Sequence, residues 1–445
     1  MLITNATVIT WGDDPQILTD YALYIDQGVI QALGPTEVLT PHYREAERLD
    51  AKGQLVMPGN VCAHTHFYGA YARGLAIPGE PPADFPAILR RLWWALDKSL
   101  DKSTIYMSTL VCLVDAIKHG ITTLIDHHAS PNAIPGSLDV IADAIDRVGL
   151  RAVLAYEVSD RDGQEKAQAG IEENVRFIHA YKNHPRIRGT FGLHASMTLS
   201  DATLKACVDA LPQDCGFHIH VAEHEADQQD SLEKYQKRVV QRLFDLGVLG
   251  EKTIAAHCIH IDEQERALLK QTGTWITHQP RSNMNNGVGA MSFDDMMREN
   301  LRVCLGNDGF SNNMWAEWKT AYLLHKVVNR DPRSANGTDI VQMAIYNNAR
   351  LVEQFFSGSR FGELTEGAAA DIIFVDYKPY TPITANNLPW HIIFGFESSM
   401  VTTTIVNGTV LMHDRKLLTI SEEVVIEDAL SMVNKVWKRY QENVR

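Results

Sequence analysis

Residues 55–66 read LVMPGNVCAHTH, an apolar run that closes on two histidines one residue apart. Seven further apolar runs follow, separated by amphipathic stretches with helical spacing. They read GITTLIDHH (120–128), LRAVLAYEV (150–158), IRGTFGLHA (187–195), CGFHIHVAE (215–223), TIAAHCIH (253–260), TWITHQP (274–280) and RVCLGNDG (302–309). Strands that alternate with helices favour a parallel sheet, and eight such units are the number in a closed barrel. The sequence therefore predicts an α/β protein built on a (β/α)8 TIM-like barrel.

The two ends of the chain differ from this middle part. Residues 1–56 and 363–420 contain short runs that alternate apolar and polar positions, which is typical of antiparallel strands. We expect both segments to combine in one small composite β-sandwich, with the barrel at 57–362 and a C-terminal helix within 421–445. The Pro-rich stretch PGEPPADFP (78–86) and the helical AILRRLWWALDKSL (87–100) predict a lid over the barrel mouth.

Composition excludes several classes of protein. The chain has 445 residues, 45% hydrophobic and 22% charged, and a formal net charge of −14, so it has no basic field for binding nucleic acid. No apolar stretch approaches the roughly 18 residues of a membrane span, and the first residues lack the features of a signal peptide. We expect a cytoplasmic protein that binds neither nucleic acid nor membranes. The six cysteines are scattered and are expected to be reduced.

Ligand-type side chains close almost every predicted strand, at the barrel end where catalytic groups gather. His64 and His66 close the first run, His220 the fifth, and Asp308 the eighth. Three imidazoles and a carboxylate suit one divalent ion, with zinc favoured and ferrous iron as the alternative. No lysine closes the fourth run to bridge two metals, so one metal per chain is favoured.

A metal-bound water whose pKa falls to roughly 7 is a source of hydroxide at neutral pH, but a leaving amine also needs a proton. Glu223 lies three residues beyond His220, close enough to carry that proton. His257, which closes the sixth run, is expected to orient the water or to stabilise the developing oxyanion. Glu223, His257 and Asp308 are thus the predicted catalytic residues.

Candidate substrate contacts come from the other strand ends and from the predicted lid. His194 and His128 close the fourth and second runs, and Trp93 and Trp94 lie in the lid helix. Each also has a structural interpretation: adjacent tryptophans on a helix commonly serve packing, and buried histidines are commonly hydrogen-bonded core groups. The roles of His127, His128 and His218 stay open at this stage.

The motifs MPGNVCAHTH, HVAEH, AAHC, HQPRSNMNNGVG and LGNDGFSNN, in this order, resemble the amidohydrolase superfamily and its triazine hydrolase and aminohydrolase branch. LWWALDKSLD, IDHHASP and PRSNMNNGVG are most similar to SsnA-type aminohydrolases. The resemblance implies the same ligands and catalytic residues, together with a homodimer or larger homo-oligomer. The fourth run (LHASMTLSD) departs from the pattern of the branch, and so does the seventh, at Gln279 and Arg281.

The leading hypothesis is a metal-dependent deaminase that removes an exocyclic amine from a nitrogen heterocycle such as a purine, pterin, pyrimidine or s-triazine, with release of ammonia. One alternative is hydrolysis of a chloro- or alkylamino-substituted heterocycle or of a cyclic amide. A remote alternative is a non-catalytic scaffold, since a fold alone does not establish a function.

Overall fold

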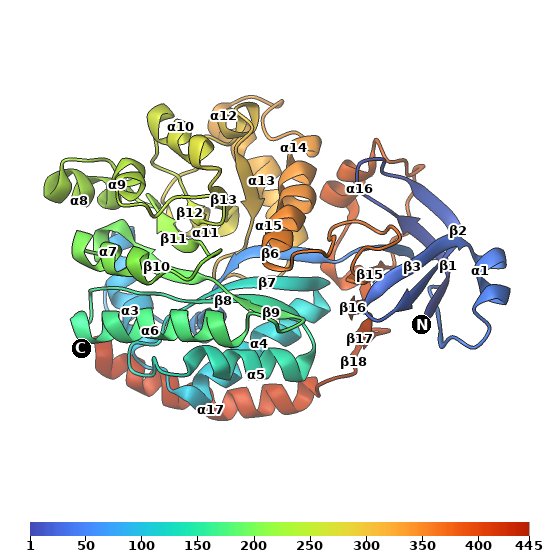
Figure 1. The fold of residues 1–445 in the computed structure, drawn as a ribbon, viewed down its shortest axis with the longest axis horizontal. Coiled ribbons are helices and arrows are strands. Elements are labelled where there is room, and N and C mark those ends of the chain that lie inside the picture. Colours follow the sequence, from blue (N-terminus) through green and yellow to red (C-terminus); the bar gives the residue numbers. More distant parts are fainter. Residues whose placement is uncertain (445) are drawn as a thin grey trace.

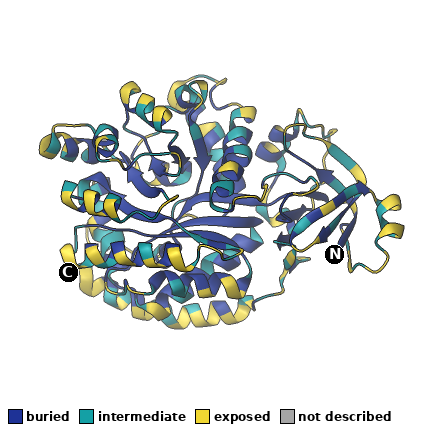
Figure 2. Ribbon diagram, in the orientation of Figure 1, coloured by how far each residue is buried: buried dark blue, intermediate teal, exposed yellow. Residues whose placement is uncertain are grey.

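The computed structural model describes residues 1–444 as a large body of parallel strands and helices beside a smaller sheet (Figure 1). The small sheet holds the N-terminus and lies at the right of Figure 1. Strands inside the large body are buried along nearly their whole length, and exposed residues gather on the outer faces of the helices (Figure 2). This burial on both faces is typical of parallel strands covered by helices.

The strands of the large body form two parallel sheets. The first sheet holds, in order, β6 (Asn60–Thr65), β7 (Ile121–His128), β8 (Arg151–Tyr156) and β9 (Ile187–Gly189). The second holds β10 (Phe191–Ala195), β11 (Phe217–Val221), β12 (Ile254–His257), β13 (Trp275–His278) and β14 (Arg302–Leu305). Only Thr190 separates β9 from β10, and both come from the fourth predicted run. The two sheets thus contain the eight predicted strands.

Backbone contacts join the two sheets at both edges. At one edge Val158 bridges Leu193, and the Val158 N–H donates to the Gly192 carbonyl at 3.1 Å. At the other edge Thr65 bridges Asp308. The two sheets thus face each other with backbone contacts at both junctions, in an arrangement of the TIM-barrel type, as predicted.

The second junction, between residues 64–66 and 307–308, is called the seam below. The His66 N–H donates to the Asp308 carbonyl at 3.2 Å, and the Asp308 N–H donates to the His64 carbonyl at 3.1 Å. The Thr65 hydroxyl also donates to the Asp308 carbonyl, at 2.9 Å. The first and last barrel strands are thus joined by residues that the sequence predicts as metal ligands.

Helices cover the outside of the circuit. They are α4 (Lys102–Lys118), α5 (Ser137–Val148), α6 (Gln164–Ala180), α7 (Asp201–Ala210), α8 (Glu225–Tyr235), α9 (Val239–Asp245), α10 (Glu263–Thr272), α11 (Pro280–Asn286), α12 (Phe293–Arg298), α13 (Met314–Asn329), α14 (Gly337–Val341), the π-helix η4 (Gln342–Asn347) and α15 (Asn348–Phe355). Asp101 and Asp262 begin α4 and α10 with capping boxes, which satisfy backbone N–H groups at those ends.

Short helices fill the long interval after β6, where the lid is predicted. They are the 3-10 helix η1 (Phe67–Ala72), α2 (Phe85–Ile88), the π-helix η2 (Leu89–Trp93) and α3 (Trp94–Asp97). The C-terminal helix α17 (Glu422–Val444) holds this segment, because Tyr440 donates to the Arg91 carbonyl at 2.7 Å and the Trp437 indole donates to the Tyr71 carbonyl at 2.9 Å.

Strands from both ends of the chain form one nine-stranded sheet. Its order is β18 (Lys416–Leu417), β17 (Thr409–His413), β16 (Val401–Val406), β15 (Ile372–Val375), β5 (Leu55–Pro58), β1 (Leu2–Ile9), β2 (Ile17–Asp26) and β3 (Val29–Pro35), with β4 (Arg48–Asp50) paired to β1. Three helices, α1 (Thr36–His42), α16 (Leu388–Gly395) and the 3-10 helix η5 (Ser398–Met400), interrupt these segments. The domain boundaries themselves stay a prediction.

The run 55–66 divides between the two parts, since β5 belongs to the terminal sheet and β6 to the barrel. Gly59 lies at this division, where a Cβ atom would come within 2.1 Å of the Thr122 side chain. A buried ion pair, with the Arg151 Nε 3.0 Å from Asp371, also ties the barrel to the terminal sheet. Within residues 1–444, no helix is long and apolar enough to cross a membrane.

Candidate active site

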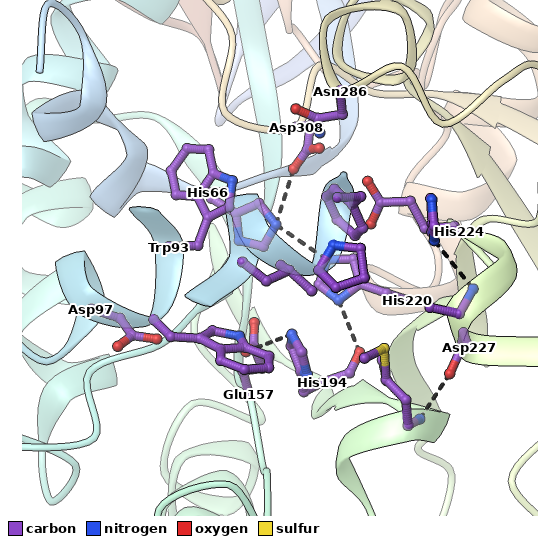
Figure 3. Close-up of a pocket in the computed structure, with 18 of the residues that line it drawn as sticks. His66, Trp93, Asp97, Glu157, His194, His220, His224, Asp227, Asn286 and Asp308 are labelled. Atoms are coloured by element: carbon purple, nitrogen blue, oxygen red, sulfur yellow. Dashed lines mark hydrogen bonds and ion pairs between the residues drawn. The ribbon is translucent and has the colours of Figure 1, made fainter. Parts of the chain in front are cut away.

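Four imidazoles and one carboxylate meet at the carboxyl ends of the barrel strands. The His66 Nε2 lies 3.2 Å from the His220 Nε2 and 3.1 Å from the Asp308 Oδ1. The His64 Nε2 lies 3.6 Å from the same oxygen, and the His257 Nε2 lies 4.0 Å from the Asp308 Oδ2. The structure therefore brings together all four predicted metal ligands, with His257 beside them. Figure 3 shows three of these ligands, His66, His220 and Asp308.

Each of these imidazoles is fixed through its second ring nitrogen, Nδ1. The Nδ1 partners are the His218 Nε2 for His64 (2.8 Å), the His127 carbonyl for His66 (2.5 Å), the His194 carbonyl for His220 (2.9 Å) and the Asn283 Oδ1 for His257 (2.8 Å). Carbonyl and amide oxygens only accept, so Nδ1 carries the hydrogen in His66, His220 and His257. Their Nε2 atoms are then the ones that face the cluster, which is the orientation that metal-binding histidines use.

The cluster is buried and contains unpartnered nitrogen atoms. Within the described chain, the Nε2 atoms of His64 and His257 are buried without a hydrogen-bond partner. Burial lowers the pKa of His64 to about 3 and holds the pKa of His220 well below its usual range, so both rings are neutral. Burial also opposes a charge on His66, but Asp308 outweighs it and raises the His66 pKa to about 9, so a metal ion bound there would replace a proton of this ring.

The donor set fits a divalent cation. Neutral imidazole nitrogens and an ionised carboxylate are suitable ligands for zinc or iron. Burial would raise the pKa of Asp308, but its contacts with His64 and His66 hold that pKa well below the usual range, so the carboxylate is charged. A buried negative charge facing unpartnered lone pairs is stabilised by a cation at that point.

Glu223 follows β11 and lies at the edge of this cluster. Its Oε2 is 3.5 Å from the His257 Nε2, and its Oε1 is buried without a hydrogen-bond partner among the described residues. Burial, together with the nearby charge of Asp308, raises the pKa of Glu223 well above its usual range. A carboxyl group in such surroundings can hold a proton at neutral pH and release it to a substrate.

The backbone is strained at the same strand ends. Ala222, His257, Cys258 and Asp308 have φ angles of 45°, 72°, 50° and 56°, in the left-handed region that non-glycine residues rarely adopt. Backbone hydrogen bonds hold this conformation; for example, the Cys258 N–H donates to the Val221 carbonyl at 2.9 Å. Strain of this kind gathers at functional sites, where the surrounding structure maintains it.

A cavity of about 750 Å³, its open mouth included, leads from the cluster to the lid. His66, His220, Glu223 and Asp308 line its inner end. The lid contributes apolar and aromatic side chains: Phe85, Pro86, Leu89, Trp93 and Trp94. A cavity with aromatic walls and a polar inner end suits a planar ring that carries a reactive polar group.

The predicted substrate contacts have different positions. His194, Trp93 and Trp94 line the cavity, and the Nδ1 of His194 is 2.6 Å from the Thr198 hydroxyl. His128 does not line it, because its ring is buried outside the cavity with Nε2 2.9 Å from the Ser130 hydroxyl.

The histidines left open by the sequence lie behind the cluster. His218 supports His64, and the His127 Nε2 lies 3.0 Å from the His218 carbonyl. Gln279 and Arg281, where the seventh run departs from the branch, also lie off the cavity. The Arg281 side chain forms an ion pair at 2.6 Å with Glu317 of α13. This unusual residue of the seventh run therefore contacts α13 rather than the cavity.

Several polar residues at the site were not predicted as site residues, among them Glu157 and Asp97 in the cavity wall and Arg161 behind it. Glu157 lines the cavity and lies 3.3 Å from the His127 Nδ1 and 3.6 Å from the His194 Nε2. Its position at the end of the third predicted strand was a usable signal. Asp97 lines the cavity and pairs with Arg161. No local pattern links these two residues, which are 64 positions apart.

Comparison with known proteins shows similarity over nearly the whole chain. Residues 55–411 match the model of the amidohydrolase family. The 5'-deoxyadenosine deaminase of Methanosarcina mazei is 32% identical over 436 residues, which cover 96% of each chain. The 5-methylthioadenosine/S-adenosylhomocysteine deaminase of Syntrophobacter fumaroxidans is 31% identical over 438 residues, again 96% of each.

Solved structures show the same fold. An adenosine deaminase from Xanthomonas campestris with bound zinc superposes with a TM-score of 0.85 at 23% identity, and the match covers 98% of both chains. The atrazine chlorohydrolase TrzN of Arthrobacter aurescens, complexed with zinc, gives a TM-score of 0.81 at 19% identity, over 97% of this chain and 99% of the other. These comparisons confirm the resemblance and the fold class predicted from the sequence.

Proposed function

The chain belongs to the amidohydrolase family, and from that membership we propose that it is a divalent-metal-dependent deaminase of aminated nitrogen heterocycles. The observation that carries the proposal is the cluster of inward-facing imidazoles and Asp308, beside a buried Glu223 and at the inner end of an aromatic cavity. The named relatives act on adenine-containing nucleosides, so aminated purines are the first substrates to test.

We propose His64, His66, His220 and Asp308 as the residues that would hold one divalent cation, zinc in the first instance and iron as the alternative. When bound, such a cation supplies Lewis acidity and lowers the pKa of water to about 7. The protein supports this site with the Nδ1 hydrogen bonds that orient each imidazole.

The remaining roles follow from position. The substrate ring lies between the lid tryptophans and His194, with its amine-bearing carbon at the inner end of the cavity. Addition of water to this carbon releases one proton, and the departing amine needs one, so the reaction consumes water and yields a carbonyl and ammonia. Glu223 gives a proton to the ring nitrogen and then passes one to the amine. His257, 3.5 Å from Glu223, orients the water.

Ammonia release tests this proposal. The protein is loaded with zinc, its metal content is measured, and it is incubated with aminated purines, purine nucleosides, pterins, pyrimidines and triazines. We expect ammonia from at least one ring class at about one metal per chain. Fully loaded protein that releases none would refute the deaminase proposal and favour a cyclic amide or another leaving group.

That the protein works in the cytoplasm, as a homodimer or larger homo-oligomer, stays a prediction from the sequence.

A further inference from the structure

The wall of the cavity below His66 and His220 carries a second carboxylate, Glu157. In Figure 3 this carboxylate and Asp308 lie on opposite sides of the two imidazoles. Glu157 belongs to the strand end of β8 and is only 5% exposed, yet it lines the cavity. It is therefore placed to contact a substrate whose reacting carbon lies at the cluster.

The contacts of Glu157 with the protein are long. Its oxygens lie 3.3 Å from the His127 Nδ1, 3.6 Å from the His194 Nε2 and 3.8 Å from an Arg161 nitrogen. Burial would raise its pKa, but His194, His127 and Arg161 outweigh burial and hold the pKa well below the usual range. A buried, ionised carboxylate without a short hydrogen bond gains free energy from a ligand that donates one.

No lysine or arginine side chain in the described cavity wall offers a matching positive charge. Among the lining residues, all within the described part of the chain, Asp97, Glu157, Glu223, Asp227 and Asp308 are acidic and none is lysine or arginine. A negatively charged group on a substrate would therefore be desolvated against acidic walls.

The nearest guanidinium, that of Arg161, is already neutralised. Arg161 pairs with Asp97, lies 3.6 Å from Asp162 and 3.8 Å from Glu157, and stacks with its guanidinium 5.4 Å from the Trp94 ring centre. Its Nε and Nη1 atoms make no hydrogen bond to residues 1–444, but they are buried behind the wall and Arg161 does not line the cavity.

We propose that Glu157 is a substrate-recognition residue, whose carboxylate accepts a hydrogen bond from an N–H or O–H group of the substrate and makes the cavity select uncharged heterocycles over carboxylate- or phosphate-bearing ones. This inference rests on the proposed function and specifies its substrate class. It distinguishes 5'-deoxyadenosine, the uncharged compound in the name of one relative, from nucleosides that carry a negatively charged 5' group.

The test compares wild type with Glu157→Gln, which keeps the size of the side chain and removes its charge. The probes are 5'-deoxyadenosine, adenosine 5'-carboxylate and adenosine 5'-monophosphate, and both binding (by calorimetry) and ammonia release are measured on zinc-loaded protein. Glu225→Gln is the matched control, because it removes the same charge from a side chain that is 69% exposed. Glu157→Asp keeps the charge.

We expect wild type to prefer 5'-deoxyadenosine. Glu157→Gln should weaken binding of that compound by about 10- to 100-fold, because one charge-assisted hydrogen bond is lost. The ratio of its affinity for 5'-deoxyadenosine to its affinity for either acidic probe should therefore be smaller than in wild type. Glu157→Asp and Glu225→Gln should keep the preference. Because the probes differ in size, the change in preference between variants carries the test.

The inference is overturned if wild type binds the acidic probes as well as or better than 5'-deoxyadenosine, or if it binds none of the three. It is also overturned if Glu157→Gln prefers 5'-deoxyadenosine over the acidic probes by the same factor as wild type. If Glu157→Gln does not fold, the inference is still tested by the relative affinities of wild type for the three probes and by the preference of Glu157→Asp. Selective binding of 5'-deoxyadenosine without ammonia from any heterocycle would support the inference about Glu157 and refute the proposed deaminase reaction.

Discussion

Replacing Glu223 with Gln should separate proton transfer from metal binding. Glu223 is not among the proposed ligands, and its Oε1 makes no hydrogen bond to the described residues that the amide would lose. Burial and Asp308 raise its pKa well above the usual range, so the surroundings already disfavour the charge that the amide lacks. We therefore expect the metal content to be unchanged and the free energy of unfolding to change by less than about 1 kcal/mol.

The effect on turnover should be large. Proton transfer by a positioned side chain contributes about 10²- to 10⁴-fold to a rate. At about 1.4 kcal/mol for each factor of ten, losing it raises the activation barrier by about 3 to 5.5 kcal/mol. Since Gln still fills the same space 3.5 Å from His257, the loss should fall on kcat rather than on KM.

The assay measures ammonia release, metal content by mass spectrometry and thermal unfolding on the same preparations. Glu225→Gln, exposed and two residues further along the chain, is the control and should behave as wild type. A Glu223→Gln protein that keeps its metal and turns over within tenfold of wild type would refute the role given to Glu223. Loss of metal would instead show that Glu223 supports the cluster.

Three further predictions concern stability. Arg151→Met leaves Asp371 buried and unpaired, so urea unfolding should show a loss of about 3 to 5 kcal/mol, most of it recovered in the Arg151→Met/Asp371→Leu double variant. Burial raises the pKa of Asp126 to about 7, so the folded state binds its proton more tightly than the unfolded state does, and this contribution to stability is lost as the pH rises from about 4 to 7. Asp126→Asn in metal-free protein should flatten that part of a curve of stability against pH, and an unchanged curve would contradict the assignment. A chelator should lower the unfolding temperature, and added zinc at 100 times its Kd should restore about 2.7 kcal/mol of unfolding free energy. An unfolding temperature that changes with neither chelator nor zinc would argue against a bound cation.

The barrel and the core of the site could be predicted because the local sequence of each strand shows where the strand ends. An apolar run that closes on His64 and His66, or on Asp308, defines both the strand and the residues at its carboxyl end. The barrel then brings these ends together whatever the sequence between them, so the cluster follows from eight local patterns and one topology.

What could not be predicted depends on contacts between distant segments. The pairing of Asp97 with Arg161 joins the lid to the loop after β8, and neither segment carries a pattern that identifies the other. His128 also has the same local signal as His194, at the end of a strand, but only the three-dimensional packing decides that one bonds Ser130 and the other faces the cavity. Sequence periodicity therefore does not predict where a side chain near the end of a strand points.

The seam also sets the order of events during synthesis of the protein. The Thr65 hydroxyl and the Asp308 carbonyl that it contacts are 243 positions apart in the chain. A nascent chain exposes His64 and His66 early but has no Asp308 to complete the ligand set until 308 of its 445 residues have been made. Contacts of such long separation form late in folding. The complete ligand set should therefore form only when the last barrel strand joins the first. A growing or truncated chain should bind the metal weakly, and a full metal content should indicate that the whole chain has folded.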